Sequence, residues 1–330
     1  MPAAVDTRSS TPPPSRLTDA RVRRWTSAVV LANLVGQILI VVTGGAVRLT
    51  GSGLGCSTWP QCEPGSFTPV FHDEMEFYVF VEYGNRMVGV LLGMIGIALA
   101  ILMTLAVGQL GRAIRLRTMA YTVIGVVVLQ GIIGGISVWM QLHPAIVGSH
   151  FLISGCLLVL STVLAVRWFE PDSPAVRLGS PVLRGLAWTT AGLAALVVVL
   201  GVVVTGAGPH SGDDEVGYRF AVDPYLMARV HAAAVWVFMV ALIATIVAVL
   251  RARPPLPQAR RWALVLLAVT LAQGVIGYVQ FFTGLPELLV GAHMLGAALL
   301  IVATTRTVLT IYPRGTTQSS TAATASISTS

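Results

Sequence analysis

Charged side chains are scarce in this chain, and lysine is absent altogether. Only 11% of the 330 residues are charged, whereas 55% are hydrophobic and the mean hydropathy is +0.79. An average soluble domain carries charge on about 25% of its residues. The shortage of charge therefore excludes an ordinary soluble protein and predicts a chain that lies mostly within a lipid bilayer.

Alternation of polar and apolar residues is missing too, and long apolar runs take its place. A helix needs about 20 apolar residues to cross the bilayer core. Because these runs are long and lack a period of two, they favour helices over strands. The segments lie at residues 26–47, 79–107, 118–141, 146–168, 184–207, 225–250, 262–283 and 287–311. The sequence therefore predicts an all-α integral membrane protein with eight transmembrane helices.

The placement of arginine predicts how the helices are oriented. All 21 basic residues are arginine. If the N-terminus is cytoplasmic, all but Arg48, Arg86, Arg219 and Arg229 fall on the inner side, as the positive-inside rule requires. We therefore expect a multi-pass protein of the cell membrane with both termini in the cytoplasm. The net charge of +7 then reflects topology, and no nucleic-acid partner is expected.

A repeat divides the chain into two halves. The run QGIIG at 130–134 returns as QGVIG at 273–277, an offset of 143 residues, and each glutamine precedes a histidine, His150 or His293, by 20 residues. We therefore predict two pseudo-symmetric four-helix bundles related by a parallel internal repeat. The expected parts are a disordered cytoplasmic tail (1–24), an N-terminal bundle (25–169), a cytoplasmic linker (170–183), a C-terminal bundle (184–311) and a second disordered cytoplasmic tail (312–330).

Histidines inside the membrane are the strongest candidates for chemistry. His150, His231 and His293 each begin a predicted helix on the outer side, so we expect them at one depth near the outer face. An ionisable group in a membrane is costly and suggests a function. Each histidine alone has an ordinary alternative, a hydrogen bond between helices. Two imidazoles facing each other across a bundle form an axial heme ligand pair, and His231 with His293 is the natural pair.

The first half breaks the symmetry, because Asn85 holds the place that corresponds to His231. A carboxamide is a poor iron ligand beside imidazole, so the two halves are not expected to bind the same group in the same way. Nearby Glu82 is either a proton acceptor or the partner of Arg86 in a helix pair. Arg48, Arg86 and Arg229 either bind heme propionates or pair with acidic outer loops.

Cysteines are few, and four zinc ligands are not in evidence. Cys56 and Cys62 flank Trp59-Pro60 in the first outer loop, where an oxidising compartment favours a disulfide. That disulfide is either a structural staple or a labile redox pair. Cys156 is expected to be a small buried hydrophobic residue.

Several of these residues occur together in a pattern that resembles the heme A synthase family. The pattern runs from Thr43 to Cys56 as TGGAVRLTGSGLGC, then through Trp59-Pro60-Gln61-Cys62, the Glu82–Arg86 segment, Gly148-Ser149-His150, Arg229-Val230-His231 and Gly291-Ala292-His293. The resemblance covers residues 25–311, which is nearly everything except the tails.

The resemblance implies an eight-helix enzyme that converts heme O to heme A for cytochrome oxidase assembly. A porphyrin methyl group is hydroxylated twice, and loss of water leaves a formyl group. The resemblance implies a heme b cofactor on His231 and His293, substrate heme O at His150, and an essential carboxylate at Glu82. It also implies a first-loop cysteine pair, Cys56 and Cys62, suggested to serve in electron or heme transfer. The implied partners are heme O synthase, cytochrome oxidase assembly factors and the lipid bilayer, and a homo-oligomer stays open.

Two departures from the family pattern accompany the resemblance. Many relatives carry histidine where this chain has Asn85, and a second cysteine pair is absent from the loop at 207–224. Two other functions stay open from the residues: a non-catalytic membrane diheme carrier of the cytochrome b type, and a transporter with parallel repeats. The transporter is disfavoured because its site should lie near the midplane, whereas the polar residues cluster near the outer face.

Overall fold

The computed structural model describes residues 18–70, 77–213 and 215–315, and it is all-helical apart from two isolated bridges. Its helices are α1 (Asp19–Leu49), α2 (Phe77–Leu110), α3 (Ile114–Trp139), α4 (Pro144–Phe169), α5 (Pro181–Ala207), α6 (Pro224–Leu250), α7 (Pro257–Phe282) and α8 (Glu287–Leu309). All eight are long and apolar enough to cross a membrane, which confirms the predicted all-α membrane fold.

Proline and short polar side chains set where the helices of this bundle begin. α4, α5, α6 and α7 each carry proline at the start, where its missing N–H costs no hydrogen bond. At α5 the Ser180 side chain accepts a hydrogen bond from the Leu183 N–H, and at α6 Asp223 accepts from Tyr225 and Leu226. Each of these four helices therefore begins at a defined residue.

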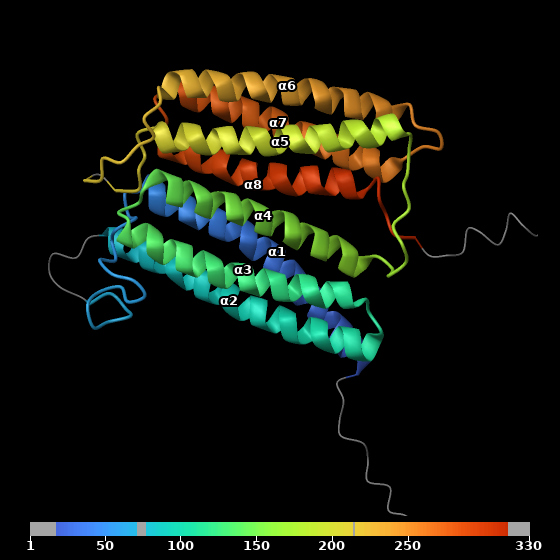
Figure 1. Ribbon diagram of the computed structural model, residues 1–330, viewed down its shortest axis with the longest axis horizontal. Coiled ribbons are helices and arrows are strands. Elements are labelled where there is room, and N and C mark those ends of the chain that lie inside the picture. Colours follow the sequence, from blue (N-terminus) through green and yellow to red (C-terminus); the bar gives the residue numbers. More distant parts are fainter. Residues whose placement is uncertain (1–17, 71–76, 214, 316–330) are drawn as a thin grey trace, which may run out of the picture.

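The eight helices form two groups of four that pack side by side (Figure 1). In the first group α1 contacts α2, α2 contacts α3, α3 contacts α4, and α4 returns to α1; α5 to α8 close in the same order. The groups meet where α8 packs on α1 and α4, and where α4 packs on α5. Val41, Leu158 and Ala298 are buried in that junction. The pseudo-symmetry of the two four-helix groups stays a prediction.

The structure corrects the predicted ends of the bundle. Helix α1 already begins at Asp19, so residues 19–24 are not a tail, and residues 1–17 lie outside the described part. At the other end the linker pairs with the chain after α8: the Val176 N–H donates to Pro313 O and the Leu178 N–H to Ile311 O, both at 2.9 Å. Residues 312–315 are therefore held in place, while residues 316–330 lie outside the described part.

Cys156 is a second correction. Its side chain lies on the exposed face of α4, with its thiol free, and is not buried as expected. A small, weakly polar side chain meets no penalty when it faces lipid instead of a helix neighbour. The hydropathy of the segment could not distinguish these two apolar surroundings.

Candidate functional site

Three histidines lie near the same ends of three helices. His150 is the seventh residue of α4, His231 the eighth of α6 and His293 the seventh of α8. At 1.5 Å per residue, each lies about 9–11 Å along its helix from the first residue. Because alternate helices point the same way, these ends lie on one side of the bundle (Figure 1). This is the side that the arginine pattern predicts to be outer.

Each imidazole lies with one edge against a glycine of a neighbouring helix. A Cβ atom placed on Gly134 of α3 would lie 3.7 Å from the Cε1 of His150. On Gly201 of α5 and Gly277 of α7, it would lie 3.3 Å from the Cε1 of His231 and His293 respectively. The Nδ1 atom of all three rings is buried and has no hydrogen-bond partner among the described residues. Buried polar atoms without partners are rare and point to a ligand or a bound water.

The repeated glutamines make the same contact in both halves. The Gln130 Nε2 of α3 donates to the backbone oxygen of His150 at 2.9 Å, and the Gln273 Nε2 of α7 donates to that of His293 at 3.0 Å. Each bond ties the helix turn that carries the histidine to the helix before it. The spacing of 20 residues found in the sequence therefore separates a glutamine from the histidine whose backbone it binds.

Helices α6 and α8 are diagonal in the second group, since α5 and α7 separate them. His231 and His293 lie at corresponding places on these two diagonal helices, the eighth residue of α6 and the seventh of α8. The corresponding diagonal in the first group joins α4, with His150, to α2, with Asn85. The Oδ1 of Asn85 accepts a hydrogen bond from the Thr43 Oγ1 of α1 at 2.8 Å.

Glu82 is buried, and its carboxylate holds the loop between α1 and α2. The Cys56 N–H donates to Oε2 at 2.7 Å, and Arg86 donates to Oε1 from Nη2 at 2.6 Å and from Nε at 3.1 Å. Arg86 also donates from Nη1 to the backbone oxygens of Thr58 and Gln61, at 3.0 Å each. The helix pair considered from the sequence is therefore formed, and it also grips the loop closed by the Cys56–Cys62 disulfide.

Trp59, inside that disulfide loop, lies directly on α3. Its indole ring packs on Gly135, where a Cβ would overlap the ring, and it meets Trp139 edge to face with centroids 5.6 Å apart. Gly135 is the neighbour of Gly134, which backs His150. The loop therefore covers the histidine side of α3. The sequence predicts that Trp59 lies in this loop, but it does not predict the contact with α3, where Gly135 and Trp139 lie four residues apart on one helix.

The predicted arginines lie in different surroundings. Arg48, at the end of α1, donates from Nε to His210 O and from Nη2 to Thr205 O, both at 2.7 Å, and so crosses from the first group to the second. Arg229 is exposed near the start of α6. Arg219, which was not predicted as a site residue, donates to the oxygens of Gly208 and Pro209 at 2.8 Å.

Within the described residues, no group of three or more His, Cys, Asp and Glu side chains gathers as a metal-ion site. The three histidines therefore differ from a zinc site, in which several protein ligands surround one point. A heme iron takes its equatorial ligands from the porphyrin and needs only one or two axial residues from the protein. The diagonal pair and the single His150 meet that smaller requirement.

Comparison with known proteins identifies the family to which this chain belongs. A model of the family described as Cytochrome oxidase assembly protein matches residues 27–210. Heme A synthase of Symbiobacterium thermophilum is 27% identical over 277 residues, covering 78% of this chain and 88% of the relative. Heme A synthase of Halalkalibacterium halodurans is 35% identical over 147 residues, covering 43% of this chain and 47% of the relative. Heme A synthase of Alkalihalophilus pseudofirmus is 28% identical, covering 47% and 50%. The chain belongs to the Cytochrome oxidase assembly protein family.

Proposed function

We propose that this protein is a heme A synthase, a membrane oxidoreductase that turns a porphyrin methyl group of heme O into a formyl group. The family match and three relatives named Heme A synthase support this function. The observation that carries it to particular residues is the set of three imidazoles near one side of the bundle, each with a buried Nδ1 that has no partner in the described residues.

In the second group, His231 and His293 would hold a heme b as axial ligands. Their places on diagonal helices and their glycine-backed rings fit a bis-imidazole heme. Small residues beside the rings leave room for a flat porphyrin. The heme, when bound, supplies electron transfer. The contribution of the chain is to place the two rings, and the bond from Gln273 to the His293 backbone holds one of them.

In the first group, His150 would bind the iron of the substrate, heme O, opposite Asn85. The Thr43 hydroxyl orients the Asn85 carboxamide, which leaves the amide group, a donor, free to contact the substrate. Substrate held through one imidazole dissociates more readily than a six-coordinate cofactor. This asymmetry suits one half to retain a heme and the other to release a product.

Each of the two hydroxylations of the methyl group is a two-electron oxidation that needs an external oxidant, and the resulting diol loses water to give the formyl group. Glu82 would accept a proton released in these steps. A carboxylate offers about four acceptor positions, and the N–H groups of Cys56 and Arg86 leave part of that capacity open. Arg86 keeps the carboxylate at a defined place beside the Trp59 loop. Arg48 and Arg86 would reach the propionates only by sharing or releasing the contacts they now have, whereas Arg229 is exposed.

The same proposal includes the membrane topology of the enzyme and its partner proteins. Eight spanning helices make it a multi-pass membrane protein. We infer from the arginine asymmetry that both termini are cytoplasmic and that the heme sites lie near the outer face. Heme O synthase and cytochrome oxidase assembly factors would be its partners, one delivering substrate and the others receiving product.

One experiment tests the function directly. The chain is expressed together with a heme O source, and the extracted pigments are separated by chromatography and weighed by mass spectrometry. We expect the heme O peak to be replaced by heme A. An unshifted heme O peak beside a protein that carries two stable, reversibly reducible hemes would instead support the diheme carrier.

A second experiment tests the cofactor ligands. In His231→Ala the purified protein should lose the absorption spectrum of a bis-imidazole heme b, because one axial ligand is gone. His143→Ala, at the loop before α4, is the matched control and should keep the spectrum. An undiminished spectrum in His231→Ala would remove His231 from the site.

A further inference from the structure

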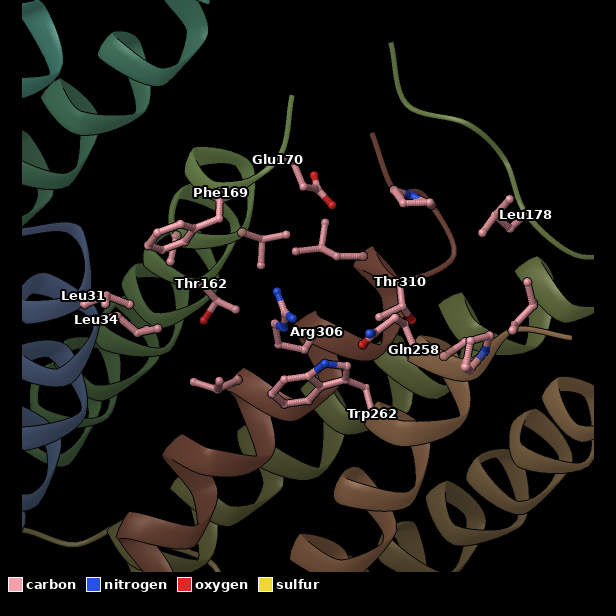
Figure 2. A pocket seen from close by; sticks show the side chains of 18 of the residues that line it. Leu31, Leu34, Thr162, Phe169, Glu170, Leu178, Gln258, Trp262, Arg306 and Thr310 are labelled. Atoms are coloured by element: carbon pink, nitrogen blue, oxygen red, sulfur yellow. The ribbon is translucent and has the colours of Figure 1, made fainter. Parts of the chain in front are cut away.

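A cavity of about 650 Å³ lies at the opposite ends of the helices from the histidines. Its walls come from both groups: Leu31 of α1 and Phe169 of α4 on one side, Trp262 of α7 and Arg306 of α8 on the other (Figure 2). By the arginine pattern this is the cytoplasmic side of the membrane. The cavity is therefore separate from the proposed heme sites.

The lining is mostly apolar, with one cation, Arg306, one carboxylate, Glu170, and the polar side chains of Thr162, Gln258 and Thr310. Figure 2 shows the Arg306 side chain reaching into the middle of the cavity, with Phe169, Leu31 and Leu34 to one side. Its guanidinium lies over the Trp262 ring, 4.6 Å from the centroid. The Arg306 Nε is buried and has no hydrogen-bond partner among the described residues. A fixed cation thus presents an unused donor to an apolar space.

The charges around Arg306 do not balance. Arg306 interacts with one carboxylate, Glu170, and with a second cation, Arg261. Glu170 is already bound by Arg167, whose Nη1 donates to its Oε2 at 2.5 Å. Arg167 and Arg306 therefore interact with one carboxylate, Glu170, and these three side chains together carry a net positive charge. An anionic group placed beside Arg306 would relieve that excess.

The paired linker and C-terminal segment form part of the cavity wall on the cytoplasmic side. Leu178 of the linker and Pro313 of the C-terminal segment line the cavity. Backbone hydrogen bonds from Val176 to Pro313 and from Leu178 to Ile311 join these two segments. An occupant would therefore touch α1, α4, α7, α8 and the linker together. An anion with an apolar tail suits such a space better than a free anion, which would leave the apolar walls unfilled.

We propose that this cavity binds an anionic phospholipid of the inner leaflet, with its phosphate on Arg306 and an acyl chain along Leu31, Leu34 and Phe169. Basic pockets between transmembrane helices on the cytoplasmic side are typical sites for anionic head groups. The volume lies within the range of sites that hold small amphiphiles. The bound lipid joins the two helix groups at their inner ends, and its binding does not depend on the proposed reaction.

The test measures lipid binding by the purified full chain in detergent, by native mass spectrometry. Dioleoyl phosphatidylglycerol is compared with dioleoyl phosphatidylcholine, which has the same tails and no net charge. We expect phosphatidylglycerol to bind at least about tenfold more tightly, and Arg306→Gln to lose about tenfold of that affinity. Arg251→Gln removes an exposed arginine at the inner end of α6, outside the cavity, and should bind as the unaltered protein does.

Other arms separate the lipid from a free anion and guard against a variant that does not fold. Leu34→Trp keeps Arg306 but fills the apolar wall, so it should also weaken phosphatidylglycerol binding. Glycerol phosphate, the head group without tails, should bind far more weakly. Equal binding of the two lipids, equal loss in Arg306→Gln and Arg251→Gln, full binding by Leu34→Trp, or binding of glycerol phosphate as tight as that of the lipid would each overturn the proposal.

Discussion

At the scale of single residues, one carboxylate links the helix bundle to the disulfide loop. Glu82 is only 5% exposed, and its charge is matched by Arg86. Removing one member of a buried ion pair leaves the other charge uncompensated. The backbone of Cys56 depends on the same carboxylate. The position of the loop over α3 therefore rests on this one side chain and its partner.

We expect Glu82→Gln to destabilise the protein by about 3 kcal/mol, because Arg86 would keep its charge without a counter-ion. The loop should loosen too, so the Cys56–Cys62 disulfide should be reduced faster by a mild reductant. Thermal unfolding and thiol labelling measure the two effects. Glu287→Gln, an exposed carboxylate at the start of α8, is the control. Equal behaviour of the two variants would show that Glu82 does not hold the loop.

At the scale of helices, close contacts between neighbours decide where the imidazoles lie. The α7–α8 pair is held by the bond from Gln273 to the His293 backbone and by the approach of the His293 ring to Gly277. Gly274, one turn earlier on α7, has open space where a side chain would start. The two glycines therefore offer a matched pair for substitution.

We expect Gly277→Ala to displace the His293 ring, since the new methyl group would lie 3.3 Å from its Cε1. The variant should bind severalfold less heme or show a shifted heme absorption band. Gly274→Ala adds the same methyl group to the same helix without a contact and should behave like the unaltered protein. Indistinguishable spectra in both variants would argue against a ligand role for His293.

The linker after α4 contains an ion pair that couples two loops. The Asp172 carboxylate accepts from the Arg112 Nε at 2.7 Å and from the Ala113 N–H at 2.9 Å. Burial raises the pKa of Asp172, but the hydrogen bonds from Arg112 and Ala113 and the charges of Arg112 and Arg115 outweigh it. The net effect holds the pKa below its ordinary value of 3.8.

A group with a depressed folded-state pKa stabilises the fold above its unfolded pKa, and that contribution is lost as the pH falls through the folded value. We therefore expect Asp172→Asn to be less stable than the unaltered protein at about pH 7, and the difference to shrink towards about pH 3. Thermal unfolding of both proteins across this range measures it. A gap that stays constant with pH would mean that the charge of Asp172 is not the cause.

At the scale of the whole molecule, polar contacts join two groups of helices whose buried junction is otherwise apolar. At the end of the bundle near the histidines, Arg48 of α1 binds two carbonyl oxygens at the end of α5 and in the loop after it, and the Gly53 N–H donates to Gly212 O at 2.6 Å. At the opposite end, Arg167 of α4 donates to Tyr312 O at 3.0 Å. These contacts set how the two groups lie against each other.

We expect Arg48→Gln to lower the free energy of unfolding by about 2 kcal/mol, because it removes two hydrogen bonds from a charged donor between the groups. Arg24→Gln, an exposed arginine near the other end of α1, changes the net charge equally and should have little effect. Unfolding in detergent with rising denaturant measures both. An Arg48 variant as stable as the Arg24 variant would show that the two hydrogen bonds of Arg48 do not contribute to the free energy of unfolding.

The number, type and approximate ends of the helices followed from the sequence alone. In lipid every backbone N–H and C=O needs a hydrogen-bond partner, and a helix supplies these partners within one segment. A long apolar run is therefore expected to be a helix. The glutamine-to-histidine spacing was equally local, since both residues lie on consecutive antiparallel helices. The candidate residues His150, His231, His293 and Glu82 followed from the cost of polar groups in such segments.

Only the tertiary structure decided which distant residues meet. Arg48 finds its partners more than 150 residues away, Trp59 lies on Gly135, and the linker pairs with the chain after α8. The cavity around Arg306 has walls from four helices and therefore has no signature in any one of them. Hydropathy reports how apolar the surroundings of a segment are, but lipid and a neighbouring helix are equally apolar. The packing of one helix on another, and hence each of these contacts, depends on the shapes of side chains far apart in the chain.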